Sequence, residues 1–217
     1  MKKERFLSAL SLTLLLTSLS AVAQVQRSPD PIDPIAEVTA AGWMTAYPDG
    51  NFRSEAVLSR AELATILVKA FRLEQRQPQQ PEIQLQDVPA SHWAYADIQA
   101  VLRNGIMTGY RQGRFFPEQR MTRAEAFSII AQAYGVFQFP EASIAEILEP
   151  YPDATDIPAW AKKSMATALY EGFVNLQPDR QIVPLAPMTR GDAAHALSVY
   201  LRRQQAPAEL PWQPAAL

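Results

Sequence analysis

The sequence predicts an all-α protein built from three copies of one helix-loop-helix unit, packed together with pseudo-threefold symmetry. Three observations lead to this prediction: a four-residue string occurs three times, glycines and turns recur at the same offsets, and apolar residues follow a helical period. The strings are Ser59-Arg60-Ala61-Glu62, Thr122-Arg123-Ala124-Glu125 and Thr189-Arg190-Gly191-Asp192. One short unit buries little apolar surface, so we expect the three units to share a core.

The repeats are related by offsets of 63 and 67 residues, measured between the arginines of the strings. Several separate features obey these offsets. They are the glycines Gly42, Gly105 and Gly172, the turns at 47–50, 110–113 and 177–180, and the pair Trp93-Ala94, which recurs as Trp160-Ala161. Agreement among independent features is strong evidence for internal repetition.

Residues 1–23 are typical of a secretory signal peptide. Basic residues at positions 2, 3 and 5 precede an apolar run at 6–19, which ends in Ala21-Val22-Ala23. Hydroxyl side chains interrupt this run, and its length makes a membrane anchor the weaker interpretation. No later stretch has the apolar length of a membrane helix, so we expect an exported mature chain of 194 residues with no transmembrane segment.

The composition excludes several classes of function. The chain lacks cysteine, which excludes disulfides and thiolate chemistry. Its net charge is −2, and it becomes about −4 without the basic signal segment, so we expect no nucleic acid partner. The two histidines, His92 and His195, have no metal-ligand or triad spacing, and the sequence gives no argument for a convergent pair of carboxylates. We expect no enzymatic activity, no metal and no cofactor.

The first repeat, residues 24–72, has a shortened first helix. Pro34 interrupts a helix of full length, because a helix-interior proline removes a hydrogen bond and clashes with the preceding turn. We expect this helix to be capped by Asp33, with Pro34 as its first residue and with Ile35 and Val38 facing the core.

The second and third repeats, residues 87–135 and 151–203, each begin with an amphipathic helix. Its apolar residues are spaced by four, three and one positions, which places them on one face. These residues are Ala94, Ile98, Val101 and Leu102 in the second repeat, and Ala161, Met165, Ala168 and Leu169 in the third. Gly105 and Gly172 are expected to end these helices in the left-handed conformation.

The second helix of every repeat begins at the four-residue string, which has the pattern of a capping box. The connections at 73–86 and 136–150 are expected to be linkers that are rich in Gln and Pro or weakly helical. Residues 204–217, rich in Pro and Ala, are expected to form a disordered tail.

The second repeat closely resembles an S-layer homology motif. The resemblance is carried by Asp87-Val88-Pro89, His92-Trp93-Ala94, Ile98, Gly105-Ile106, Gly109-Tyr110, Phe115-Phe116-Pro117 and Thr122-Arg123-Ala124-Glu125. The first and third repeats resemble the motif more loosely, and the three together cover about residues 30–203. The resemblance implies an all-helical, prong-like domain of three motifs.

The resemblance also implies a function. Proteins of this family bind a secondary wall polymer that often carries pyruvate ketals, through grooves between the motifs. The matching positions are Arg60, Arg123, Arg190, Tyr47, Asp49, Gly50, Tyr110, Gly113, Trp93 and Trp160. We therefore expect non-covalent anchoring to a carboxylate-bearing, peptidoglycan-linked polysaccharide, in the periplasm or at the wall surface.

Arginine at a helix start supports this function on physical grounds. A guanidinium can hold a carboxylate through two parallel hydrogen bonds, and unpaired N–H groups at the helix start add to the attraction. The arginines do not cap the helices, and the helix dipole disfavours a cation at a helix start. We therefore expect the arginines to lie in open grooves. Trp93 and Trp160 have two explanations, as core anchors or as exposed platforms for a sugar ring.

Several positions depart from the family pattern. Gln112 replaces the loop aspartate of the second repeat, and in the third repeat Gln177 replaces tyrosine and Arg180 replaces glycine. We therefore expect one or two competent grooves rather than three. An alternative function is a helical adaptor that binds another envelope protein through an exposed apolar patch.

Overall fold

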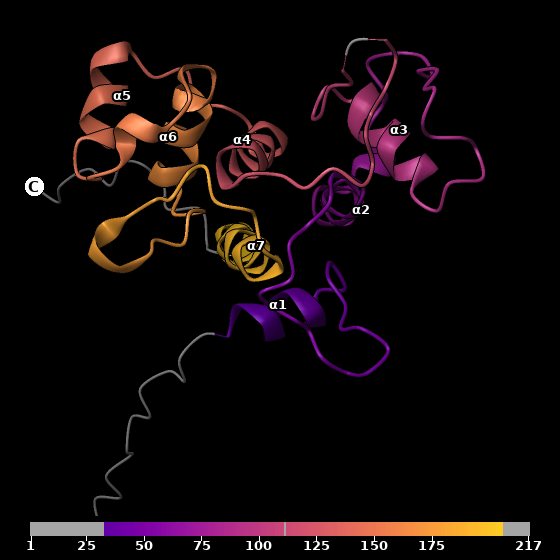
Figure 1. Ribbon diagram of the computed structural model, residues 1–217, viewed down its shortest axis with the longest axis horizontal. Helices are drawn as coiled ribbons and strands as arrows, with labels where there is room; N and C mark the ends of the chain where they lie inside the picture. Colours follow the sequence, from indigo (N-terminus) through magenta and orange to yellow (C-terminus); the bar gives the residue numbers. More distant parts are fainter. Residues whose placement is uncertain (1–32, 111, 206–217) are drawn as a thin grey trace, which may run out of the picture. The chain divides into compact units, whose positions relative to one another are not determined.

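The computed structural model describes residues 33–110 and 112–205, and within these ranges it contains seven α-helices, four 3-10 helices and no strand (Figure 1). The predicted all-α class is therefore confirmed. The predicted signal peptide and residues 206–217 of the predicted tail lie outside the described residues. None of the described helices combines the length and the apolar character needed to cross a membrane.

The helices follow the repeat order. The α-helices are α1 (Pro34–Ala40), α2 (Arg60–Phe71), α3 (Tyr95–Arg103), α4 (Arg123–Tyr134), α5 (Glu141–Leu148), α6 (Lys162–Tyr170) and α7 (Arg190–Gln205). The 3-10 helices are η1 (Leu73–Gln75), η2 (Ala154–Asp156), η3 (Ala159–Ala161) and η4 (Pro178–Arg180). Helix α5 lies in the connection predicted as a linker, and α7 extends two residues into the predicted tail.

The helix starts follow the predicted caps. Asp33 caps α1 by accepting the N–H of Ile35 at 2.9 Å, and Pro34 is the first helical residue. A side-chain cap of this kind stabilises a helix start by about 1 kcal/mol. Capping boxes open the second helix of each repeat, formed by Ser59 with Glu62, Thr122 with Glu125 and Thr189 with Asp192.

Each first helix packs on the second helix of the preceding repeat. Helix α3 packs on α2, α6 packs on α4, and α1 packs on α7, which belongs to the third repeat (Figure 1). Because the first repeat packs on the last, the three repeats close into a ring. The predicted pseudo-threefold packing is confirmed, and the exchange of helices between repeats is a feature that the sequence did not reveal.

The predicted apolar stripes form the core. All eight predicted stripe residues, which lie in α3 and α6 or directly before them, are buried together with Val38 of α1. An aromatic cluster joins the second helices of the three repeats: the ring of Tyr200 lies 4.3 Å from Phe71 and 6.0 Å from Tyr134. Helices α2, α4 and α7 are thus tied together at the centre of the ring by side chains that no single repeat could bury.

In the second and in the third repeat, an aspartate carboxylate clamps the loop by accepting hydrogen bonds from two adjacent backbone N–H groups. The Asp87 carboxylate accepts the backbone N–H groups of Phe115 and Phe116 at 2.9 and 2.7 Å. Asp153 makes the same pair of bonds in the third repeat, including one to Val183 at 2.7 Å. Phe116 and Val183 have φ angles of 55° and 50°, a left-handed conformation that is unfavourable for bulky residues. The charge-assisted bonds hold the chain in this conformation.

We predict that Asp87→Ala lowers the free energy of unfolding by about 2 to 3 kcal/mol, because bonds to a charged acceptor are among the stronger hydrogen bonds. Urea denaturation measures this loss. Asp49→Ala is the matched control, since the Asp49 carboxylate pairs with Arg53 on the exposed surface and its removal should change stability little. Equal losses for the two variants contradict a clamping role for Asp87.

Candidate functional site

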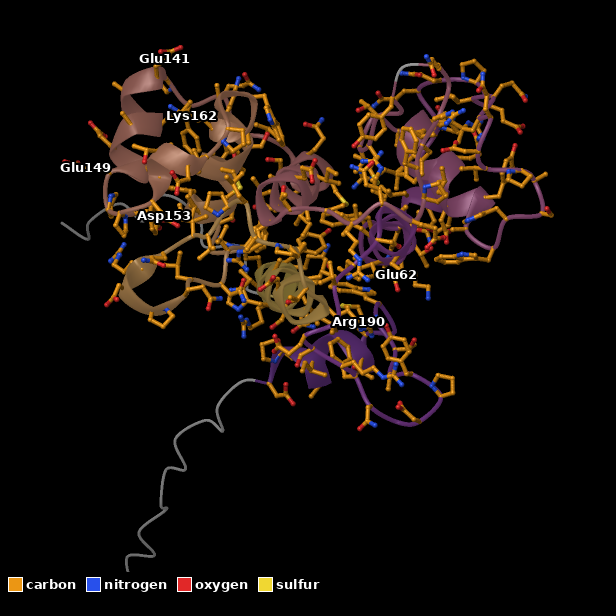
Figure 2. All side chains as sticks on the ribbon, in the orientation of Figure 1. Glu62, Glu141, Glu149, Asp153, Lys162 and Arg190 are labelled. Carbon is orange, nitrogen blue, oxygen red and sulfur yellow. The ribbon has the colours of Figure 1, made fainter. Side chains whose placement is uncertain are left out.

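The three arginines of the repeated string lie at the three junctions between repeats. They are the first residues of α2, α4 and α7, and their exposed fractions are 6% for Arg60, 2% for Arg123 and 8% for Arg190. Figure 2 labels Arg190 at the start of α7 and Glu62 in the first turn of α2. The sequence predicted arginines in open grooves, whereas each guanidinium is largely buried against the loop of another repeat.

Each guanidinium donates two hydrogen bonds, from Nε and Nη2, to backbone carbonyls of the next repeat in the ring. The acceptors are Phe115 and Thr108 for Arg60 (2.8 and 2.9 Å), Ile182 and Asn175 for Arg123 (2.9 and 2.7 Å), and Phe52 and Thr45 for Arg190 (2.9 and 2.6 Å). These bonds explain why arginine stands where the helix dipole disfavours a cation: it satisfies carbonyls of irregular loops. The same bonds occupy Nε and Nη2, a pair of nitrogens of the kind that was expected to bind a carboxylate through two parallel hydrogen bonds.

The backbone at each helix start is paired across the same junctions. The first two helical N–H groups donate to the next repeat, from Arg60 and Ala61 to Gln119 and Pro117, from Arg123 and Ala124 to Ala186 and Pro184, and from Arg190 and Gly191 to Ala56 and Ser54, at 2.8 to 3.0 Å. The expectation that unpaired helix-start N–H groups receive an acid group is therefore wrong, because the ring itself uses them.

Aromatic rings contact the guanidinium at all three junctions, and at two of them a pair of rings from the loop of the next repeat does so. Arg60 lies 4.8 Å from the ring centre of Tyr110 and 4.5 Å from that of Phe115. The equivalent rings around Arg190 are those of Tyr47 and Phe52, at 4.9 and 4.6 Å. The predicted site residues Tyr47 and Tyr110 thus contact the arginines through cation–π interactions.

At the third junction Gln177 and Ile182 stand at the positions of the two loop rings. The Arg123 guanidinium lies 5.0 Å from the ring centre of Phe127, on its own helix, and it also forms a buried ion pair. Nη1 of Arg123 lies 2.6 Å from Oδ1 of Asp192, and both side chains are buried. Asn175 completes the cluster by donating to Asp192 at 2.7 Å. Burial on its own raises the pKa of Asp192, but the Thr189 N–H and the Arg123 charge outweigh burial and hold this pKa below its usual value.

Nη1 of Arg60 and of Arg190 differs from Nη1 of Arg123. Neither nitrogen has a hydrogen-bond partner among residues 33–110 and 112–205. Burial lowers the pKa of Arg60, and the neighbouring Tyr110 and Glu125 oppose this effect. The guanidinium keeps its charge because arginine starts from a very high pKa. Arg60 and Arg190 therefore retain one unused charged donor each.

Three grooves border the junctions. The Arg60 groove, about 290 Å³, is lined by Arg60, Thr108, Glu125, Ser128, Gln132 and Trp160 together with apolar residues of the second repeat. The Arg123 groove, about 440 Å³, is lined by Glu55, Arg123, Asn175, Gln177 and Asp192 among others. The Trp93 groove, about 270 Å³, is lined by Val57, Ser59, Glu62, Trp93, Glu118 and Arg120.

The two predicted tryptophans are exposed. Trp93 and Trp160 are each 63% exposed, so the explanation of these residues as core anchors is wrong. Trp160 is the middle residue of η3, directly before α6 of the third repeat, and it lines the Arg60 groove, whose other lining residues belong to the preceding repeats. An unused cationic donor and an exposed aromatic face therefore border the same groove.

The predicted loop residues shape turns rather than these grooves. Gly50 and Gly113 have φ angles of 81° and 64°, a left-handed conformation that glycine adopts without strain. Asp49 is exposed, and its hydrogen bond from Arg53 lowers its pKa. None of the three lines the Arg60, Arg123 or Trp93 groove.

The polar face of α4 was not among the predicted site residues. Glu125, Ser128 and Gln132 all line the Arg60 groove, and their spacing of three and four residues places them on one side of the helix. This periodicity was a usable signal, but it has the same pattern as an ordinary solvated helix face. The described ranges hold no group of three His, Cys, Asp or Glu side chains arranged to bind a metal ion.

Comparison with known proteins agrees with this architecture. Residues 25–64, 85–127 and 150–194 match the model of the S-layer homology domain. The chain is 30% identical over 169 residues to the Surface-layer 125 kDa protein of Lysinibacillus sphaericus, an alignment that covers 76% of this chain and 14% of that protein. It is 28% identical over 167 residues to the Cellulosome-anchoring protein of Acetivibrio thermocellus, covering 75% of this chain and 36% of that protein.

The similarity extends to a relative named for an enzyme. The chain is 24% identical over 220 residues to an Endoglucanase of a Bacillus species, covering 93% of this chain and 23% of that protein. The chain therefore spans well under half the length of each of these three relatives.

We predict that Asp192→Asn lowers the free energy of unfolding at pH 7 by about 3 kcal/mol, because it leaves Arg123 buried without an opposite charge. Folding lowers the pKa of Asp192. The Asp192 carboxylate therefore contributes its full stabilisation above the unfolded pKa of about 3.9. This stabilisation is lost as the pH falls through the folded pKa. The difference between wild type and variant should shrink below about pH 4. Urea denaturation at pH 7 and pH 3 checks this, and an unchanged difference contradicts it.

Proposed function

Because this chain belongs to the S-layer homology domain family, we propose that it attaches non-covalently to the cell wall by binding a peptidoglycan-linked polysaccharide that carries carboxylate groups, with pyruvate ketals as the candidate acid. The observation that carries this proposal is the Arg60 groove, where one unused guanidinium nitrogen and the exposed face of Trp160 border the same cavity.

The fixed guanidinium of Arg60 supports the binding of an acid group. Its Nε and Nη2 atoms are held by backbone carbonyls, so Nη1 faces a ligand with little freedom left to lose. A carboxylate that accepts from Nη1 forms a charge-assisted hydrogen bond. Glu125 borders the same groove, but its carboxylate accepts the Thr122 N–H at 2.8 Å and so has a partner of its own.

The three grooves differ in how well their charged and aromatic groups support the binding of a carboxylate. The Arg123 groove has its guanidinium nitrogen engaged by Asp192, and Glu55 adds a second negative charge to its lining. The Trp93 groove offers an exposed indole and Arg120 beside two glutamates. We therefore propose the Arg60 groove as the primary site, the Trp93 groove as a weaker one, and the Arg123 junction as structural.

The proposed module is non-enzymatic and acts outside the cytoplasm, in the periplasm or at the wall surface. A predicted signal peptide supports the proposed location. The names of two relatives, a surface-layer protein and a cellulosome-anchoring protein, are consistent with a role in attachment.

A second candidate is an adaptor for another envelope protein. A pocket of about 460 Å³ between α5 and α6 favours it, with the apolar side chains of Phe139, Ile144 and Leu148 and the charged side chain of Lys162 in its lining. Figure 2 labels Lys162 and Glu141, which both line this pocket. This pocket lies in the connection between the second and third repeats rather than at a junction arginine.

We predict that Trp160→Ala weakens binding to purified cell-wall sacculi by at least about tenfold, as expected for an aromatic anchor at a binding site. Chemical removal of pyruvate from the sacculi should abolish binding by the wild type. Trp160→Ala is a better test than Arg60→Ala, because the arginine substitution also removes two hydrogen bonds of the junction.

Tyr170→Ala is the matched control for the sacculus test. Tyr170 is 61% exposed, close to the exposure of Trp160, but it does not line any of the three junction grooves. We expect this variant to sediment with sacculi as the wild type does. Binding that survives pyruvate removal and the loss of both Trp93 and Trp160 favours the adaptor function.

A further inference from the structure

One buried polar atom in the Arg60 groove has no partner. Ser128 lies on α4 and is 8% exposed, and its Oγ is the buried side-chain polar atom without a hydrogen bond among residues 33–110 and 112–205. Burying a hydroxyl without a partner lowers stability, and nearly all buried polar groups in proteins are paired. The fold alone therefore gives no reason for a hydroxyl at this position.

The equivalent position in the other two repeats is satisfied inside the protein. Thr65 in the first repeat donates from Oγ1 to Asp97 at 2.7 Å. His195 in the third repeat lies with Nε2 at 3.2 Å from the carbonyl oxygen of Gly172. The unpaired hydroxyl is therefore specific to the second repeat, whose groove also contains the unused donor of Arg60.

The surroundings of Ser128 define the chemistry available to a ligand. Ser128 and Gln132 supply neutral polar groups from one face of α4, while the charge of the groove lies on Arg60 and Glu125. Rotation of χ1 between its staggered wells moves the Ser128 Oγ without moving the helix. A hydroxyl at this place can pair with a neutral oxygen of a molecule whose acid group contacts Arg60.

We propose that Ser128 is a specificity-determining residue of the Arg60 groove, where it hydrogen-bonds a neutral ring substituent oxygen of the sugar that carries the carboxylate. This inference rests on the proposed function and adds to it a second point of recognition on the same sugar. It also explains the unpaired atom, since a hydroxyl kept for a ligand lowers the stability of the free protein.

The test compares two buried serines, with soluble wall polysaccharide released from sacculi by a muramidase as the probe. Ser128→Ala should weaken binding in calorimetry about fivefold, the loss expected for one neutral hydrogen bond. Its melting temperature should stay the same or rise, because the substitution removes an unpaired polar atom. If Ser128 had a structural role instead, Ser128→Ala would lower the melting temperature.

Ser198→Ala is the matched control. Ser198 lies on α7, is fully buried, and donates its hydroxyl to Glu37, so its loss should lower the melting temperature and leave binding unchanged. Ser128→Thr keeps a hydroxyl and introduces the residue found at the equivalent position of the first repeat, so its binding should stay close to that of the wild type.

The outcomes separate this inference from the proposed function. If wild-type protein binds neither sacculi nor the released polysaccharide, the proposed function fails, and the role of Ser128 fails with it. If the wild type binds and Ser128→Ala binds equally well, or if Ser128→Ala melts at a lower temperature, the inference about Ser128 is overturned while wall binding stands.

Discussion

The structure depends on one repeated interaction, the arginine that begins the second helix of each repeat and donates to two carbonyls in the loop of the next. Arg60 holds the second repeat, Arg123 holds the third, and Arg190 returns to the first, so the chain closes on itself. Loops of this kind leave carbonyls that neither a helix nor a sheet can pair. A charged, planar donor satisfies two such carbonyls at once, and it fixes the distance between neighbouring repeats.

The three junctions solve the problem of a buried cation in two different ways. Arg60 and Arg190 are each contacted by two aromatic rings from the loop of the next repeat, which attract a cation without consuming its hydrogen bonds, whereas Arg123 has the ring of Phe127 alone. Arg123 is paired with Asp192, and this pairing uses the nitrogen that the other two arginines leave free. The same fold thus combines two junctions at which a guanidinium nitrogen has no partner among the described residues with one at which an ion pair occupies that nitrogen.

The Arg60 groove, where we propose ligand binding, is built by neighbouring repeats together. The Arg60 groove takes its cation from the first repeat, its polar helix face from the second and its indole from the third. No single repeat contains the three groups, because each first helix packs on the preceding repeat. The stability of the ring and the geometry of the groove are therefore coupled through the same contacts, and a substitution at a junction arginine alters both.

The sequence by itself determined the two helices of each repeat, their caps and their buried faces, although not α5. These features depend on short spacings: Asp33 before Pro34, the capping boxes at Ser59 and Thr122, and the stripe from Ala94 to Leu102. It also identified Trp160 and Arg60 as site candidates, through repetition and family resemblance. The roles of the candidates could not be predicted, because they depend on groups tens of residues away. Only the tertiary structure decided that the helices are exchanged between repeats, that Nε and Nη2 of Arg60 serve the loop carbonyls of Phe115 and Thr108, and that Ser128 lacks a partner, since hydrogen bonds between distant segments leave no local pattern in the chain.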